Sequence, residues 1–296
     1  MPTLVIGATG QLGSDIMRLW PTGDSTGLTH ADIEVTDRDQ VFAVLRSYKP
    51  DLVVDTAAFH NVDACESEPE RAFRVNAVGA MNLADACREL GAELMFISTD
   101  YVFGNDLGRP YTETDMPTPI NVYGASKAAG EQLIRSRLDH HYIVRTSGLY
   151  GEVGSGGKGG NFVQRMLELG RSGQDLRVVD DQVLSPTFTY DLAQGLLGLA
   201  HTGRHGTYHM TNGGACSWYQ FAAKIFSLTA TNASLSATTT AEFAAKARRP
   251  AYSVLCNAAL SDAGLPLLRE WPEALADYLH KKGELQPNSQ QREGPR

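Results

Sequence analysis

The strongest constraint on the fold of this 296-residue chain is an alternation of short apolar, β-branched runs with longer stretches of helical periodicity. This alternation is typical of β-α-β units, which build a parallel sheet. We expect strands at 3–7, about 25–29, 51–57, 93–99, 141–147 and 176–180. Right-handed crossovers would join them into one doubly wound sheet with helices on both faces. The sequence therefore predicts an α/β fold whose ligands lie beyond the carboxyl ends of the strands.

The sequence predicts three helix boundaries between these strands. Thr36, followed three residues later by Asp39, predicts the N-cap of a helix at 37–47. Ser67 predicts the start of a longer helix. Gly91 would end that helix, because glycine readily adopts the left-handed conformation of a C-cap.

The regular alternation stops after about residue 150. Residues 151–160 hold six glycines and predict a loop above the sheet, but the residues around Lys158 do not match a phosphate-binding P-loop. Beyond it we expect helices at 189–201, 217–229 and 270–282 and a short strand at 206–211. We therefore assign 1–150 to a main domain whose sheet is completed within about 151–212, 181–282 to a smaller mixed α/β lobe, and the polar residues 283–296 to a disordered tail.

Composition excludes several classes of protein. Lys and Arg number 26 against 34 Asp and Glu, and a net charge of −8 offers no basic surface to nucleic acid or anionic lipid. No apolar run approaches the ~20 residues that span a bilayer. The first strand begins too close to Met1 for a signal peptide. The four cysteines form no C-x-x-C pair, so we expect neither a structural disulfide nor a metal site, and a cytoplasmic location.

A glycine motif, Gly7-Ala8-Thr9-Gly10-Gln11-Leu12-Gly13, follows the first expected strand directly and opens a helix. Glycines let the backbone turn tightly and approach a pyrophosphate, whose charge is then met by the helix N-terminus. The same turn can also join a strand to a helix with no ligand. Its place as the first β-α turn of an α/β chain favours a dinucleotide.

The end of the second strand bears on the choice of dinucleotide. An Asp or Glu at that point would bind the ribose hydroxyls of NAD and repel the extra phosphate of NADP. The chain has no acid there, so NADPH is favoured, with Thr29 and His30 as contacts to its 2′-phosphate. NADH stays open, because Asp32 or Glu34 could still bind its ribose.

Two further segments carry groups for proton transfer. Tyr123 and Lys127 form Y-x-x-x-K at the start of an expected helix, where residues four apart lie on one face. An adjacent cation lowers the pKa of a phenol, so Tyr123 is a candidate general acid and Lys127 its electrostatic partner. Thr99 lies at the carboxyl end of the fourth expected strand, where its hydroxyl can bond a substrate carbonyl. Each segment alone is also compatible with a solvated helix or a turn, but their order and spacing suit one active site.

Together these motifs resemble an extended short-chain dehydrogenase/reductase, specifically the dTDP-4-dehydrorhamnose reductase family, over residues 1 to about 280. The resemblance is carried by the glycine motif, by 98–103, by Asn121-Val122-Tyr123-Gly124 with Lys127, and by 62–66, 75–77, 145–147, 181–182, 185–187, 206–209, 217–218 and 247–250. It implies a Rossmann-like doubly wound parallel sheet that binds NAD(P) within 1–150, with a smaller C-terminal α/β substrate lobe at 181–282.

The resemblance also implies a reaction, the reduction of the C4 ketone of a nucleotide-linked 4-keto-6-deoxy sugar, most simply dTDP-4-dehydro-L-rhamnose to dTDP-L-rhamnose. Tyr123 would protonate the C4 oxygen while NAD(P)H delivers hydride to C4, Lys127 would hold the nicotinamide ribose, and Thr99 would polarise the carbonyl. The other implied cofactor contacts are Gly7, Thr9, Gly10, Gln11, Leu12, Gly13, Glu34, Val35, Ala57, Ala58 and Phe59, and the other substrate contacts are Asp100, Ser147 and Arg248.

One position departs from the family pattern. The family typically has Trp after Arg-Thr-Ser, where it packs on the sugar, whereas here Gly148 follows Ser147. Phe103, Tyr150 and Phe162 are candidates to replace that aromatic platform. The exact sugar of the dTDP-linked substrate therefore stays open. Whether the chain forms a homodimer is also open.

Other functions are also compatible with these motifs. A sugar-nucleotide dehydratase or epimerase belongs to the same superfamily, but dehydratases use Thr-Asp-Glu and Tyr101 occupies the Glu position here. A regulatory protein such as the β-subunit of methionine adenosyltransferase resembles the same family and works through partner binding. The intact set of Thr99, Tyr123 and Lys127 favours turnover instead.

Overall fold

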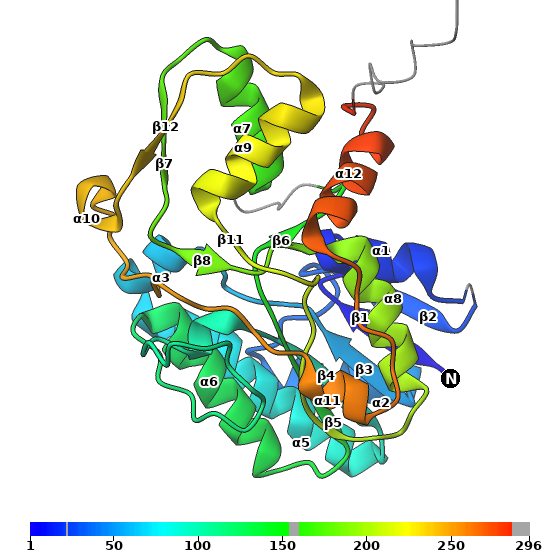
Figure 1. Cartoon of the computed structure of the whole chain (residues 1–296). Coiled ribbons are helices and arrows are strands. Elements are labelled where there is room, and N and C mark those ends of the chain that lie inside the picture. The colour runs from blue at the N-terminus through cyan, green and yellow to red at the C-terminus, as the bar shows by residue number, and fades with distance from the viewer. Residues whose placement is uncertain (22, 154–159, 286–296) are drawn as a thin grey trace, which may run out of the picture.

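Within residues 1–21, 23–153 and 160–285, which the computed structural model describes, six parallel strands form one sheet in the order β10-β5-β4-β3-β1-β2 (Figure 1). These strands are β1 (Thr3–Ile6), β2 (Ser25–Leu28), β3 (Leu52–Asp55), β4 (Glu93–Thr99), β5 (His141–Thr146) and β10 (Gly206–His209). The chain adds β2 on one side of β1 and the later strands on the other. The predicted Rossmann-like doubly wound sheet is confirmed, and its topology places a crevice above the carboxyl ends of β1 and β3.

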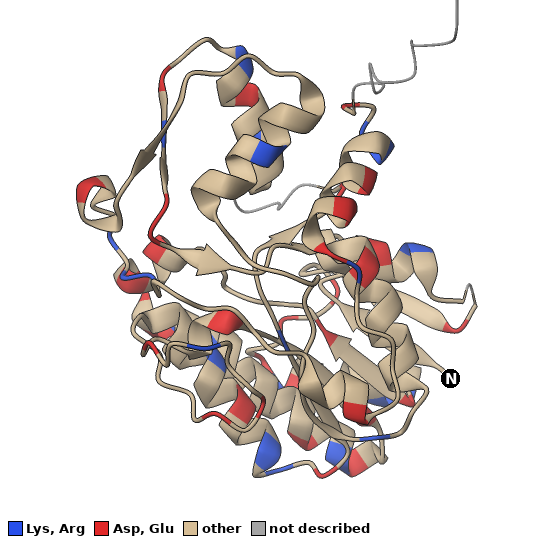
Figure 2. Ribbon diagram, viewed as in Figure 1, with Lys and Arg blue, Asp and Glu red and all other residues tan. Residues whose placement is uncertain are grey.

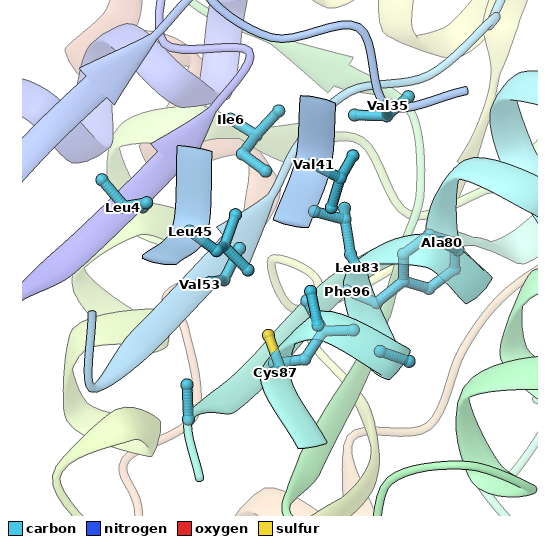
Figure 3. Packing of buried hydrophobic residues seen from close by; sticks show 14 of the residues in the cluster. Leu4, Ile6, Val35, Val41, Leu45, Val53, Ala80, Leu83, Cys87 and Phe96 are labelled. Atoms are coloured by element: carbon cyan, nitrogen blue, oxygen red, sulfur yellow. The ribbon is translucent and has the colours of Figure 1, made fainter. Parts of the chain in front are cut away.

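Helices cover both faces of the sheet. One face carries α2 (Arg38–Tyr48), α5 (Ala80–Leu90) and α6 (Val122–Arg135), and the other carries α1 (Gln11–Leu19) and α8 (Thr189–Ala200). Figure 3 shows Leu4 and Val53 of the strands packed against Leu45 of α2, with Leu83 of α5 and Phe96 of β4 beside them. Because β1 and β3 are buried at every position, they read as continuous apolar runs, and this is why they were recognisable in the sequence.

The remaining elements connect these layers or form the lobe, which Figure 1 shows above the sheet. The connecting elements are α3 (Val62–Ser67), α4 (Pro69–Phe73), the π-helix η1 (Arg74–Gly79), the 3₁₀ turn η2 (Asp100–Val102), β6 (Leu149–Tyr150), β9 (Thr187–Phe188) and α11 (Ala258–Asp262). The lobe elements are α7 (Phe162–Arg171), β7 (Leu176–Val179), β8 (Val183–Leu184), β11 (Cys216–Ser217), α9 (Trp218–Thr229), β12 (Leu235–Thr238), α10 (Thr240–Phe243) and α12 (Trp271–Lys281). Aromatic and aliphatic side chains of α7, α9 and α12 form a core of their own.

The strand predicted at 176–180 forms as β7, but it does not join the main sheet. It pairs in parallel with β12 inside the lobe, and β10 takes the outer place next to β5. In β7, Leu176 and Val178 are buried while Arg177 is exposed. A strand with one solvent-exposed face fits a two-stranded ribbon better than a parallel sheet that helices cover on both faces.

Two predicted helix caps are wrong. Asp37 rather than Thr36 caps α2, since its side chain accepts a hydrogen bond from the backbone N–H of Gln40. Ser67 ends α3 instead of starting a long helix, because the ring of Pro69 disfavours a helical conformation at the preceding residue. The predicted stop at Gly91 is correct, with φ of 71° there.

Part of the predicted loop and tail lies outside the described residues, namely 154–159 and 286–296. Residues 283–285 are described, and they pack on the lobe through Leu285 and an ion pair between Glu284 and Arg171. In the described part of the chain, no helix has both the length and the apolar character needed to cross a bilayer. Figure 2 shows acidic and basic residues interspersed along the helices in this view.

Candidate active site

A cleft of about 590 Å³ lies between the carboxyl ends of the central strands and the lobe. It brings together nine of the residues predicted to bind cofactor or substrate: Gly10, Gln11, Leu12, Gly13, Ala58, Thr99, Asp100, Tyr123 and Ser147. From the lobe side it is lined by residues that include Asn161, Phe162, Arg165, Gln182, Leu184, Trp218 and Ser253. The cleft lies where a doubly wound sheet binds its ligands.

The glycine turn is packed so tightly that side chains would not fit. Gly7 has φ of +82°, and a Cβ there would lie 2.6 Å from the hydroxyl oxygen of Thr56. A Cβ on Gly13 would lie 2.2 Å from the carbonyl oxygen of Gly7. Helix α1 begins directly after Gly10, and its first residues line the cleft together with Gly10. This cradle fits the pyrophosphate of a dinucleotide.

The predicted contacts at the end of β2 lie beside this turn, but they do not line the cleft. The backbone N–H of Gly7 donates to the carbonyl of Leu28 and so keeps the strand end next to the turn. Thr29 donates its hydroxyl to Asp32 at 2.7 Å, and the ring of exposed His30 lies 3.5 Å from Glu34. The cofactor roles of this group stay predictions.

Five other predicted contacts also lie off the cleft lining. Thr9 is exposed in the glycine turn, and Val35 is buried. Ala57 and Phe59 follow β3, where Asn76 exchanges hydrogen bonds with the backbone of Phe59 and so fixes this segment. Arg248 is exposed, and its backbone carbonyl accepts from Asn121.

Tyr123 lies near Thr99 in the cleft lining, because α6 begins beside the end of β4. Asn121 caps α6, with its side chain accepting from the backbone N–H of Gly124 at 2.8 Å. The phenol of Tyr123 and the hydroxyl of Thr99 both line the cleft and lie close together there. Burial raises the pKa of Tyr123, nearby Asp100 adds to this effect, and the neighbouring hydroxyl of Thr99 opposes it. The phenol therefore keeps its proton at neutral pH.

Lys127 lies one helical turn further along α6 and is buried. Its ammonium is 3.7 Å from the ring centre of Phe96 and has no hydrogen-bond partner among the described residues. Burial lowers its pKa to about 8, and the charges of Asp55 and Glu131 oppose that shift. A buried donor without a partner is costly unless a ligand satisfies it. Lys127 itself does not line the cleft, so its contact with a cofactor ribose stays a prediction. The expected lowering of the Tyr123 pKa is not seen, because burial outweighs any cationic influence there.

Asp100, in the turn after β4, accepts three hydroxyl donors. Its Oδ2 accepts from Ser147 at 2.8 Å and from Ser253 at 2.6 Å, and its Oδ1 accepts from Thr99 at 3.1 Å. Burial raises the pKa of Asp100 to about 6, although all three hydroxyls act to lower it. Sequence reasoning missed Ser253, because no motif marks a single serine far along the chain.

A buried ion pair braces the helix that carries Tyr123. Glu131 of α6 accepts from Nε of Arg145 on β5 at 2.9 Å and from its second guanidinium nitrogen at 2.7 Å. Ser98 of β4 donates to the same carboxylate at 2.6 Å. This network joins α6 to the two central strands, and paired charges at this depth have little freedom to move.

Gly148 lies in the cleft wall where the family pattern has Trp. It has φ of +55°, and a Cβ there would lie 2.7 Å from Cδ1 of Leu184. Of the aromatic side chains expected to replace the Trp, Phe103 and Tyr150 are buried elsewhere. Phe162 does line the cleft, with its ring centre 4.5 Å from that of Trp218.

Comparison with known proteins agrees with this geometry. A family model described as the RmlD substrate binding domain matches residues 1–283. The chain belongs to the dTDP-4-dehydrorhamnose reductase family. The predicted family and fold class are thereby confirmed.

Among the described residues, no group of three or more His, Cys, Asp or Glu side chains could hold a metal ion.

Relatives of this reductase-family chain match it along nearly its whole length. It is 42% identical over 282 residues to the spore coat polysaccharide biosynthesis protein SpsK of Bacillus subtilis, with 94% of this chain and 97% of that protein covered. It is 41% identical over 283 residues to the dTDP-4-dehydrorhamnose reductase of Streptomyces griseus, with 93% and 91% covered. The Bacillus anthracis dTDP-4-dehydrorhamnose reductase, solved in complex with NADP, is 38% identical with a TM-score of 0.90, covering 94% of this chain and 98% of that one.

Proposed function

We propose that this oxidoreductase uses NADPH to reduce the C4 ketone of a dTDP-linked 4-keto-6-deoxy sugar, most simply dTDP-4-dehydro-L-rhamnose. The observation that carries this proposal is the placement of Tyr123 and Thr99 side by side in the cleft lining. One helical turn behind Tyr123 lies the buried ammonium of Lys127, which has no hydrogen-bond partner among the described residues. Membership of the reductase family supports the reaction, and the NADP bound by the Bacillus anthracis relative supports the cofactor.

Each polar group has a separate task in this proposal. Bound NADPH supplies the hydride that adds to C4. Tyr123 holds its proton because burial raises the phenol pKa, and it donates that proton to the C4 oxygen as negative charge develops there. Thr99 donates a second hydrogen bond to the same oxygen. Lys127 binds a ribose hydroxyl of the cofactor and so fixes the nicotinamide relative to Tyr123.

The first test is removal of the phenol hydroxyl. Tyr123→Phe should lower kcat for dTDP-4-dehydro-L-rhamnose by about 10²–10⁴-fold, because a positioned proton donor contributes a factor of this size. The measurement is the loss of NADPH absorbance, with NMR of the product to fix the C4 configuration. Tyr142→Phe is the matched control, since Tyr142 is a buried tyrosine near the start of β5. Its hydroxyl donates to Glu93 at the start of β4, at the opposite end of that strand from Thr99.

Two results would contradict the proposal. If wild-type protein binds NADPH but reduces no dTDP-linked 4-ketosugar, the chain is a binding homologue rather than a reductase. If Tyr123→Phe matches the wild type while the reaction proceeds, the proton comes from another group.

The second test concerns the cofactor. Lys127→Met keeps the length and apolar character of the side chain but removes the ammonium. It should weaken NADPH binding by roughly tenfold or more, since hydrogen bonds from charged groups are worth that much. Fluorescence titration measures the affinity for NADPH and, in parallel, for NADH. Equal NADPH affinity in the variant and the wild type would rule out the ribose contact.

A further inference from the structure

Ser253 lies on the segment that returns from the lobe to the end of the sheet. Its backbone N–H donates to the carbonyl of Val183 in β8 at 2.9 Å, and Leu255 forms a bridge with Tyr111 beside the sheet. Ser253 is 3% exposed. From this position its hydroxyl donates to Oδ2 of Asp100 at 2.6 Å, so a residue of the C-terminal segment contacts the residue that follows Thr99.

The hydroxyl of Thr99 has a single proton, and in the structure that proton is directed to Asp100. The oxygen of Thr99 meanwhile accepts the backbone N–H of Tyr101 at 3.2 Å. For Thr99 to bond a substrate carbonyl, its O–H must turn away from Asp100. Asp100 then depends on its other donors, Ser147 and Ser253, to keep its buried carboxylate hydrogen-bonded.

We propose that Ser253 is a positioning residue of the reaction: by holding the Asp100 carboxylate from the lobe side, it sets how readily Thr99 turns its proton toward the substrate carbonyl oxygen. The step is an exchange of hydrogen-bond partners, and no covalent bond forms or breaks. The inference rests on the proposed function for the role of Thr99. It differs from the sugar contact predicted for Asp100, because both carboxylate oxygens are engaged within the protein.

Removal of the Ser253 hydroxyl gives the test. In Ser253→Ala, Asp100 retains fewer donors and holds the Thr99 proton more strongly, so kcat should fall roughly tenfold. KM for the ketosugar and affinity for NADPH should stay within about twofold, because neither ligand loses a contact. Ser253→Thr keeps a hydroxyl and should recover most of kcat.

The pH profile separates this role from a merely structural one. Because the Ser253 hydroxyl lowers the pKa of Asp100, its loss should move the inflection that Asp100 gives to the kcat profile to higher pH. Tyr101 and Tyr123 are the other titratable side chains that the described structure brings beside Asp100, and both have raised pKa values, so neither titrates at that inflection. Ser185→Ala is the matched control: Ser185 is a buried lobe serine whose hydroxyl donates at 2.8 Å to the carbonyl of Gly214.

A second measurement does not depend on turnover. NMR titration of the aspartate carboxyl carbons, with the Asp100 signal assigned from Asp100→Asn, should show Asp100 titrating at higher pH in Ser253→Ala and in Ser147→Ala than in the wild type. If this shift is present but no ketosugar is reduced, the hydrogen-bond coupling stands and the proposed function fails. If the reduction proceeds and Ser253→Ala leaves both the kcat profile and the Asp100 titration unchanged, the inference is overturned.

Discussion

Two aspartates are buried at the carboxyl ends of the central strands, and their charge opposes folding. Asp55 ends β3 and Asp100 follows β4. Burial raises the pKa of each to about 6. A carboxyl whose pKa is higher in the folded chain than in the unfolded chain stabilises the fold in its protonated form. That contribution is present below the ordinary value of 3.8 and is lost as the pH rises through about 6. This edge of the sheet therefore keeps two buried carboxylates at a cost to stability near neutral pH.

Asp55 offers the cleaner test, because it accepts one backbone hydrogen bond, from Ala57. Asp55→Asn keeps that acceptor and removes the charge. The free energy of unfolding of the variant relative to the wild type should rise by on the order of 2 kcal/mol between pH 4 and pH 7. Urea unfolding at several pH values measures it. Asp39→Asn, on the exposed surface of α2, is the control, and equal pH dependence in all three proteins would contradict the burial argument.

The residues of the site differ in how far the sequence could predict them. Thr99 and Tyr123 were recognisable because each lies at a boundary that local pattern defines, the end of a strand or the start of a helix. Ser253 could not be predicted, because its partner Asp100 lies 153 positions away and only the fold of the intervening chain brings the two residues together. The sequence also could not show that the ammonium of Lys127 is buried without a hydrogen-bond partner among the described residues, since burial depends on packing and not on sequence spacing.

At the scale of elements, the catalytic geometry depends on how closely α6 approaches the turn after β4. A Cβ on Gly124 would lie 2.0 Å from the carbonyl oxygen of Tyr101. Glycine normally weakens a helix by roughly 0.5–1 kcal/mol relative to alanine. Here it lets Tyr123 reach Thr99, so the close approach of the two elements serves the site.

Gly124→Ala tests this close approach. The added methyl group should push α6 away from the turn, increase the distance between Tyr123 and Thr99, and lower both kcat and the melting temperature. Gly198→Ala in α8 is the matched control, because a Cβ there meets its nearest neighbour, Leu265, at an ordinary 3.5 Å. That control should raise the unfolding free energy by about 0.5–1 kcal/mol through helix propensity alone. A stabilised, fully active Gly124→Ala would show that the contact has no role.

The sequence predicted most elements correctly but not always their partners. Strands β1, β3, β4 and β5 are buried on both faces, so continuous apolar runs marked them. Leu176–Val179 was recognised as a strand, but strand pairing is a long-range choice and β12 supplied the partner. Local chemistry also decided the end of α3, where Pro69 has more influence than the capping tendency of Ser67.

At the scale of the whole molecule, two cores lie against the faces of the sheet and a third lies inside the lobe. Polar contacts join the lobe to the sheet layers. One is Ser253 with Asp100, and another is Arg269, which precedes α12. Arg269 bonds Asp191 of α8 at 2.8 Å and 2.9 Å and Asp277 of α12 at 2.7 Å. Figure 1 shows α12 directly above α8, so this ion-pair cluster lies at the junction of lobe and sheet layer.

No sequence pattern predicted this junction, because the three residues come from separate elements and each alone reads as a surface charge. The cleft lies between the same two bodies, so the stiffness of the junction sets how far the lobe can move over the ligands. We therefore expect a substitution at Arg269 to affect both stability and ligand affinity.

Arg269→Met should leave Asp191 buried without its cation and lower the unfolding free energy by about 1–3 kcal/mol, less than for a fully buried pair because Arg269 is one-third exposed. The matched control is Arg171→Met, which breaks a more exposed ion pair with Glu284 on the lobe and should change stability by less than about 1 kcal/mol. Urea unfolding measures the change in unfolding free energy of both variants.

Hydrogen exchange of the α12 amides shows whether the destabilisation is local to that helix. Faster exchange in α12 with unchanged exchange in β4 is expected, because the central strand keeps its own core. Equal effects of the two substitutions on unfolding and exchange would mean that the junction is held by apolar packing alone.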